Sequence, residues 1–222
     1  MNVVMRKLIA KELYVNRWFI VAGSLSAIAS VLIALTGKTG FNIGALAWLT
    51  TIIALGVMLA LYGIMNERKE HTLQFVLSLP LSTGDYVCAK MLGLMACFLL
   101  VWLVGSAAAL LLVLGHPGVP DGLAPYTLLL CMFMLANYAV VLCGAFYAQS
   151  EAQTTGIIVV TNMGVSIFMF TIAPMDGINR YLSSPAAVWN STFWTVLGCE
   201  LAVLVIAFTL PFFLAARRRD FL

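Results

Sequence analysis

The stretch that decides the fold is MLGLMACFLLVWLVGSAAALLLVL, residues 91–114, which contains no charged side chain. A helix needs about 20 largely apolar residues to cross the hydrocarbon core of a bilayer. The backbone N–H and C=O groups of a segment in lipid must be satisfied within that segment, which favours a helix. The stretch therefore predicts a transmembrane helix, and its apolar run extends back to Tyr86 with one basic residue, Lys90, near its start.

The rest of the chain has the same character. Of its 222 residues, 63% are hydrophobic and only 9% are charged, whereas a soluble domain has roughly a quarter charged residues. No ten-residue segments of alternating polarity, typical of a membrane barrel, are present. The sequence therefore predicts an all-α integral membrane protein with six transmembrane helices: Trp18–Thr36, Ile43–Met65, Tyr86–Leu114, Tyr126–Ala148, Gly156–Ala173 and Phe193–Ala215.

Basic residues predict the orientation of these spans, because Lys and Arg are enriched in cytoplasmic loops. With six spans, both termini lie on one side. That side holds ten of the basic residues: Arg6, Lys7, Lys11, Arg17, Arg68, Lys69, Lys90, Arg217, Arg218 and Arg219. The other side holds two, Lys38 and Arg180. We therefore expect both termini in the cytoplasm, and we read the net charge of +3 as a feature of membrane topology, with no nucleic-acid partner.

The N-terminal segment, residues 1–17, precedes the six-span domain of residues 18–222. It is neither long nor apolar enough for a cleavable signal peptide. Helical spacing puts Met5, Leu8, Ile9 and Leu13 on one face and Lys7, Lys11 and Tyr14 on another. This pattern predicts an amphipathic helix on the inner membrane surface, in contact with lipid. The alternative is a polar tail that frays.

The longest predicted cytoplasmic loop is NERKEHTLQFVLSLPLSTGDYVCAK, residues 66–90. Five consecutive ionisable residues, Glu67–His71, precede Leu73, Val76 and Leu77, whose spacing forms one apolar face of a short helix. Pro80 ends that helix, because the residue before a proline avoids the helical region. The loop thus predicts a charged amphipathic helix in the cytoplasm. The alternative is a solvated connector that only sets topology.

These residues resemble the ABC-2 type permeases, the membrane subunits of certain ATP-driven exporters. The resemblance covers an acidic-basic pair, a T-L-x-x-x-L-x-L-P-L-S motif and a lysine at the start of the third span. The pair is Glu67-Arg68 and the lysine is Lys90. The motif residues are Thr72-Leu73, Leu77 and Leu79-Pro80-Leu81-Ser82. It also covers the whole plan of an amphipathic N-terminal helix, six spans and a basic C-terminus. His71 departs from the pattern, since family members commonly have glycine before the threonine.

The resemblance implies a coupling helix at about residues 66–80 that is seated in a separate ATP-binding subunit. The residues it assigns to that contact are Glu67, Arg68, Glu70, Thr72, Leu73, Val76 and Leu77. It implies two copies of this ATPase subunit, which would hold ATP and Mg, and a second permease copy in a homodimer or a heterodimer. It also implies a bacterial inner membrane location and a re-entrant segment at the outer face, about residues 174–192. No cofactor is expected in this chain.

Three polar residues inside the predicted spans are candidates for a substrate path. Glu200 is the one carboxylate well inside a span, and an ionisable residue in such a place is a functional candidate. Its helical neighbours are apolar, so any partner must come from another helix. Asn137 and Asn162 are mid-span amides, which more often join helices than bind a ligand. For all three, a structural role is the alternative.

Other functions fit the sequence less well. Gly37-Lys38-Thr39 ends like a phosphate-binding loop, but Leu32 stands where the first glycine of that motif belongs. An intramembrane hydrolase would need a base inside the bilayer, and neither histidine, His71 or His116, lies in a predicted span. Five cysteines without a C-x-x-C pair do not indicate a metal site. The other alternative is a membrane scaffold or sensor subunit that transports nothing.

Overall fold

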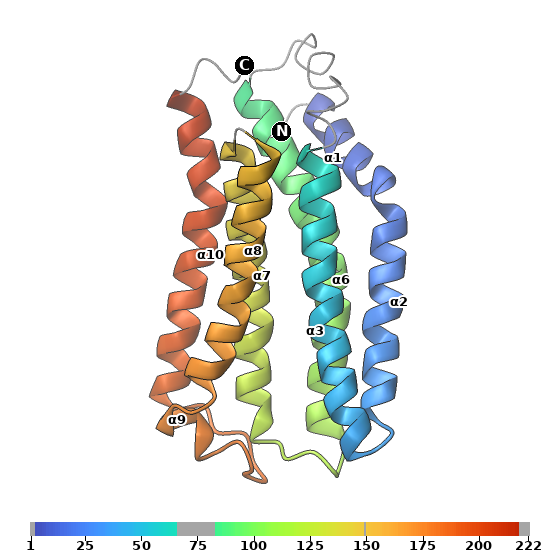
Figure 1. The fold of residues 1–222 in the computed structure, drawn as a ribbon, viewed down its shortest axis with the longest axis vertical. Helices are drawn as coiled ribbons and strands as arrows, with labels where there is room; N and C mark the ends of the chain where they lie inside the picture. Colours follow the sequence, from blue (N-terminus) through green and yellow to red (C-terminus); the bar gives the residue numbers. More distant parts are fainter. Residues whose placement is uncertain (1–2, 66–82, 149, 218–222) are drawn as a thin grey trace.

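The computed structural model describes residues 3–65, 83–148 and 150–217, and all regular structure in these residues is helical (Figure 1). The elements are α1 (Val3–Val15), α2 (Arg17–Ala34), α3 (Lys38–Ala60) continued by the π-helical turn η1 (Leu61–Met65), α6 (Thr83–Gly115), α7 (Leu123–Tyr147), α8 (Glu151–Ile172), α9 (Asp176–Asn179) and α10 (Ser191–Arg217). Among the described residues, six helices are long and apolar enough to cross a membrane. The predicted all-α membrane fold is confirmed.

The six long helices run side by side, so the bundle has two distinct ends (Figure 1). One end, called here the basic end, carries α1, the end of η1, the start of α6 and the end of α10. The opposite end carries the α2–α3 turn, the α6–α7 connection and α9. Of the described basic residues, six lie toward the basic end (Arg6, Lys7, Lys11, Arg17, Lys90, Arg217) and two toward the opposite end (Lys38, Arg180).

Helix α7 is the centre of the bundle, since the largest buried share of any span is in this helix. It packs against α10 on one side and against α6 and α8 on others. Leu129, Cys131 and Leu142 of α7 are fully buried, and Phe98 of α6 stacks on Tyr138 with ring centroids 4.0 Å apart. By contrast, α2 and α10 expose large apolar side chains, as helices that face lipid do.

Helices α2 and α3 form a tight hairpin because two glycines lie at their contact. A Cβ added at Gly44 would lie 2.7 Å from the Ala34 Cβ, and Gly40 leaves no room beside Thr36. Small residues four positions apart let membrane helices approach closely. Gly37 turns the chain with a φ of 118°, a conformation that suits glycine. The connection between the predicted spans Trp18–Thr36 and Ile43–Met65 is shorter than predicted, since α3 already begins at Lys38.

The predicted re-entrant segment, about residues 174–192, folds at the opposite end as the four-residue helix α9 and a connection without regular structure. This segment is tied to its surroundings by polar contacts. Gly122 N donates to the Ser184 carbonyl at 3.0 Å, and the Asn190 side chain bonds the Gly177 carbonyl while accepting from Phe193 N at 2.9 Å. Its entry into the membrane stays a prediction.

Candidate functional site

The residues predicted to bind an ATPase subunit, Glu67, Arg68, Glu70, Thr72, Leu73, Val76 and Leu77, lie outside the described residues, as does the rest of the coupling helix at 66–80. The elements on either side of this segment are described and lie close together. A Cβ added at Gly63 of η1 would be 2.9 Å from the Leu94 Cδ1 atom of α6. A π-helical turn such as η1 is often found at a functional position.

A buried ion pair lies at the basic end, between α1 and α6. Lys90 Nζ donates to Glu12 Oε1 at 2.8 Å, and the two residues are each 4% exposed. Lys11 of α1 lies farther from the same carboxylate, at 3.8 Å, and its side chain is 44% exposed. A charge leaves water at a large cost, which only a close, well-bonded partner offsets. This pair therefore holds the two helices in one relative position.

The Glu12 backbone is part of the same contact. Its carbonyl accepts from the Asn16 side-chain amide at 2.9 Å, and the Cys97 thiol points to it at 3.7 Å. Gly93 lets α1 approach, since a Cβ there would lie 2.8 Å from the Glu12 Cβ and Cγ atoms. We call Glu12, Asn16, Lys90 and Cys97 the inner polar cluster.

Sequence reasoning predicted the apolar face of α1 but missed this cluster. Met5, Leu8, Ile9 and Leu13 are partly buried, while Lys7, Lys11 and Tyr14 are exposed, as predicted. Glu12 and Asn16 continue the buried face at helical spacing. A carboxylate inside an apolar stripe was the signal that could have found the cluster. In the sequence, Lys90 contributes only to the orientation of the spans and to the family motif, which do not predict an ion pair.

Glu200 of α10 is buried close to Cys131 of α7. It is 6% exposed, and neither of its carboxyl oxygens has a hydrogen-bond partner among the described residues. The Ser106 hydroxyl of α6 is likewise buried without a bond of ordinary geometry. Cys131 of α7 lies near enough to interact with both groups. Glu200, Ser106 and Cys131 form what we call the outer polar cluster.

Ser106 differs from the two other buried Ser and Thr residues of the described helices, Ser30 and Thr154. Ser30 donates to the carbonyl four residues earlier at 2.7 Å, and Thr154 does so at 3.3 Å. Such a local bond satisfies the hydroxyl without a partner on another helix. Ser106 makes no such local bond within the described chain, and its hydroxyl instead lies beside the Cys131 thiol of α7.

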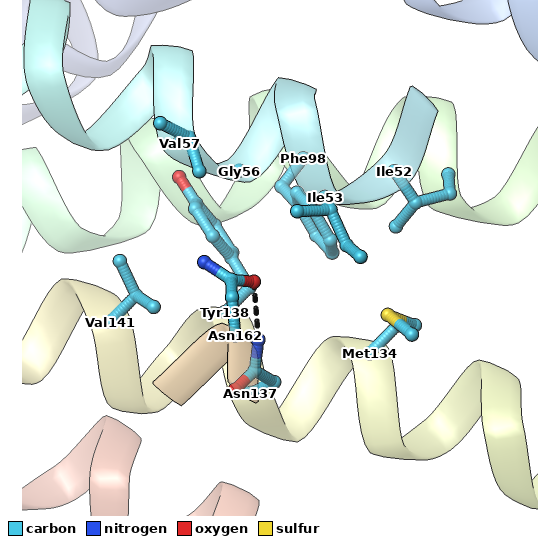
Figure 2. Close-up of a pocket in the computed structure, with 10 residues that line it drawn as sticks. All are labelled: Ile52, Ile53, Gly56, Val57, Phe98, Met134, Asn137, Tyr138, Val141 and Asn162. Atoms are coloured by element: carbon cyan, nitrogen blue, oxygen red, sulfur yellow. Dashed lines mark hydrogen bonds between the residues drawn. The ribbon is translucent and has the colours of Figure 1, made fainter. Parts of the chain in front are cut away.

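The other two candidates form a pair of their own. Figure 2 shows Asn137 of α7 and Asn162 of α8 side by side, with the Asn137 amide donating to the Asn162 carbonyl oxygen at 3.2 Å. The Asn162 amide donates to the Ile158 carbonyl at 2.8 Å. They line a small cleft that also contains Gly56 and Tyr138. The cleft admits only about 10 Å³, so it holds no substrate in this conformation.

The three sequence candidates therefore do not form one site. The asparagines join α7 to α8, whereas Glu200 lies between α10, α7 and α6. At 1.5 Å per residue, Asn137 lies about 9 Å farther along α7 than Cys131, which neighbours Glu200. Amides that bond each other across helices fit the structural role named above as the alternative.

Six apolar helices around a buried centre, with basic residues gathered at one end, define a multi-pass membrane protein. Its particular family follows from comparison with known families: the model of the ABC-2 family transporter protein matches residues 7–217, nearly the whole chain. The chain belongs to this family, whose members are membrane components of transporters and generally not themselves catalytic. Membership implies partnership with an ATP-binding subunit. A search of curated proteins found no match.

Proposed function

We propose that this chain is the permease subunit of an ATP-driven exporter, in which it forms the substrate path and a separate subunit hydrolyses ATP. The observation that carries the proposal is the family match, which extends from α1 to the end of α10 and includes all six spans. ATP and Mg would be held by two copies of the ATPase subunit. A second permease copy, the same or a similar chain, would complete the transporter.

The orientation is proposed from charge. The basic end carries six of the eight described Lys and Arg residues, and such residues are enriched in cytoplasmic loops. We therefore place the basic end and both termini in the cytoplasm of a bacterium, with the spans in its inner membrane. The predicted coupling helix then faces the compartment that contains ATP, because the two elements that flank it, η1 and α6, meet at that end.

The proposed coupling route begins at this segment. A movement of residues 66–80 acts directly on α6, whose first turn begins at Thr83. Seven residues later Lys90 is bonded to Glu12, so α6 and α1 move as one body as long as the pair is intact. The inner polar cluster would thus transmit a movement driven by the ATPase from α6 to the N-terminal helix α1. In this proposal, Glu12 and Lys90 position helices and do not contact substrate.

The outer polar cluster is the proposed part of the substrate path. Polar groups buried in a bundle without partners carry a free-energy cost that a ligand group with matching hydrogen bonds removes. Glu200 offers two acceptor oxygens and Ser106 one hydroxyl, so a substrate with donor groups fits best. The alternative for Glu200 is a structural role as a protonated carboxyl group that bonds across the bundle.

The test is reconstitution. The neighbouring reading frames are searched for an ATP-binding subunit, and the chain is purified in lipid vesicles both alone and with that subunit. We expect no nucleotide hydrolysis from the chain alone, and transport-linked hydrolysis from the complex. ATP hydrolysis by the isolated chain would contradict the proposal. A stable complex that binds ATP but moves nothing across the membrane would instead indicate a scaffold or sensor subunit.

A further inference from the structure

An apolar cavity lies between α2, α3, α6 and α7 at the opposite end of the bundle. Its volume is about 190 Å³, and its walls include Phe41, Trp48, Leu112, Tyr126 and Leu130. The volume is larger than that of an engineered apolar cavity of about 150 Å³ that binds benzene. The cavity is distinct from the Asn137–Asn162 cleft and shares no lining residue with the outer polar cluster.

Two of the four polar side chains of the wall are hydrogen-bonded within their own helices. Ser30 donates to the Ser26 carbonyl at 2.7 Å, and Thr127 donates to the Leu123 carbonyl at 3.0 Å. The Trp48 indole nitrogen is buried without a hydrogen-bond partner among the described residues and lies against α6, where a Cβ at Gly105 would be 2.9 Å away. The Tyr126 hydroxyl and the Trp48 N–H are therefore the polar groups of the wall left for a ligand. A buried water needs two to four polar partners, so this wall does not hold a chain of waters.

The cavity opens at the surface of the bundle. Ala45 of α3 is both exposed and part of the wall, and its neighbours Ile43 and Leu46 are exposed apolar side chains. In a membrane, exposed apolar positions on a span face acyl chains or another membrane helix, not water. The cavity also separates the small core cluster of Leu112, Val113 and Ala124 from the main core. An apolar occupant would restore packing between the two.

We propose that this cavity binds one acyl chain of a membrane phospholipid, with the lipid ester group near Tyr126. Tyr126 lies one turn from the start of α7 at Leu123, which is the level where aromatic hydroxyls meet the membrane interface. The volume fits part of one chain and excludes a whole phospholipid. This inference is independent of the proposed exporter function, because it depends only on the bundle and its bilayer.

The test uses a phosphatidylglycerol that carries a diazirine on one acyl chain. The full-length protein is reconstituted in vesicles of phosphatidylethanolamine and phosphatidylglycerol, irradiated and digested, and labelled peptides are mapped. We expect labels concentrated on the cavity wall from α6 and α7. Ala109→Phe, which fills the cavity, should lower this labelling roughly tenfold, the change that about 1.4 kcal/mol produces. Ala202→Phe, at an exposed position of α10, is the matched control and should change nothing.

Two further arms keep the test decisive. Tyr126→Phe keeps the shape of the wall and removes the hydroxyl, so it should lower labelling by the ester lipid and leave an ether-linked analogue unaffected. A diazirine fatty acid in place of the phospholipid separates a free acid from a lipid chain. Labels spread evenly over α2 and α10, labelling unchanged by Ala109→Phe, or labelling by the free acid alone would each overturn the proposal.

Discussion

Two buried carboxylates of this protein have almost the same exposure and opposite surroundings. Glu12 at the basic end is 4% exposed and accepts from Lys90 at 2.8 Å, whereas Glu200 is 6% exposed and has no hydrogen-bond partner among the described residues. A buried carboxylate bonded to an ammonium group holds the two helices that carry them in one arrangement. A buried carboxylate without a partner carries a desolvation cost that no hydrogen bond offsets. The two ends of the bundle are therefore built for different tasks.

The difference between the two carboxylates matches the two proposed tasks, which are coupling at the basic end and substrate binding near Glu200. In the proposed transporter, the helices near residues 66–80 transmit a movement, so a rigid joint between α1 and α6 is useful. In the same proposal, the bundle binds and releases a substrate near Glu200, and a permanent internal partner for Glu200 would compete with that substrate. The Asn137–Asn162 pair is intermediate in character, since each amide is hydrogen-bonded, as Glu12 is, but neither is charged.

The largest effect is expected from breaking the ion pair at one side only. Lys90→Met leaves the Glu12 carboxylate buried without its ammonium partner, which costs about 3–5 kcal/mol of folding stability. The double variant Glu12→Leu/Lys90→Met removes both charges and should recover most of this loss. Thermal unfolding of the purified proteins in detergent measures both. Equal losses in the single and double variants would show that the pair does not stabilise the α1–α6 joint.

A second, steric test separates the helices without changing charge. Gly93→Ala places a Cβ 2.8 Å from Glu12, so α1 must shift, at a cost of roughly 1–3 kcal/mol. The matched control is Gly198→Ala in α10, where an added Cβ meets nothing within 4 Å. We expect the control to be neutral or slightly stabilising. The prediction fails if the two alanine variants unfold at the same temperature.

A substitution at Glu200 should change stability much less and transport much more. Glu200→Gln keeps two hydrogen-bonding atoms and removes the ionisable group, so we expect a stability change within about 1 kcal/mol, in contrast to Lys90→Met. Transport should change, or lose its dependence on pH, while the complex still assembles. The measurement is substrate uptake into inverted vesicles across a pH series. Unchanged uptake at every pH would assign Glu200 to a structural role.

The smallest effect is expected at the paired asparagines. A double-mutant cycle of Asn137→Ala and Asn162→Ala should give a coupling energy near the average of about 0.6 kcal/mol for hydrogen bonds between membrane helices. Unfolding of the four proteins under one set of conditions provides the cycle. A coupling energy of several kcal/mol, or loss of transport without loss of stability, would return this pair to the substrate path.

The spans could be predicted from sequence because lipid imposes a length and an apolar composition on each segment separately. Each predicted span, from Trp18–Thr36 to Phe193–Ala215, corresponds to a helix of the bundle. Contacts between segments could not be predicted in the same way. Glu12 and Lys90 are 78 residues apart, and the local sequence around each residue does not indicate that the other is its partner. The small turn at Gly37 also depended on how closely α2 and α3 pack, which a local pattern does not reveal.

For the candidate site, too, single residues could be predicted from the sequence but the contacts between helices could not. Asn137, Asn162 and Glu200 were found because polar residues inside apolar runs are conspicuous. Their separation into a bonded amide pair and an unpaired carboxylate depends on which face of α7 meets α8 and which meets α10. The helices have weak amphipathicity, because lipid and protein core are both apolar, so the sequence does not indicate those faces.

In the proposed transporter, residues 66–80 connect this bundle to a separate ATPase, and Leu77→Asp tests this connection most directly. A carboxylate on the predicted apolar face costs several kcal/mol when that face is buried in a partner. Gln74→Asp adds the same charge off that face and serves as the control. The full-length variants are co-expressed with the neighbouring ATPase, and complex yield and substrate-stimulated hydrolysis are measured. We predict that Leu77→Asp inserts normally but loses the ATPase, while Gln74→Asp retains it. A normal complex with normal coupling in Leu77→Asp would show that the segment is only a connector.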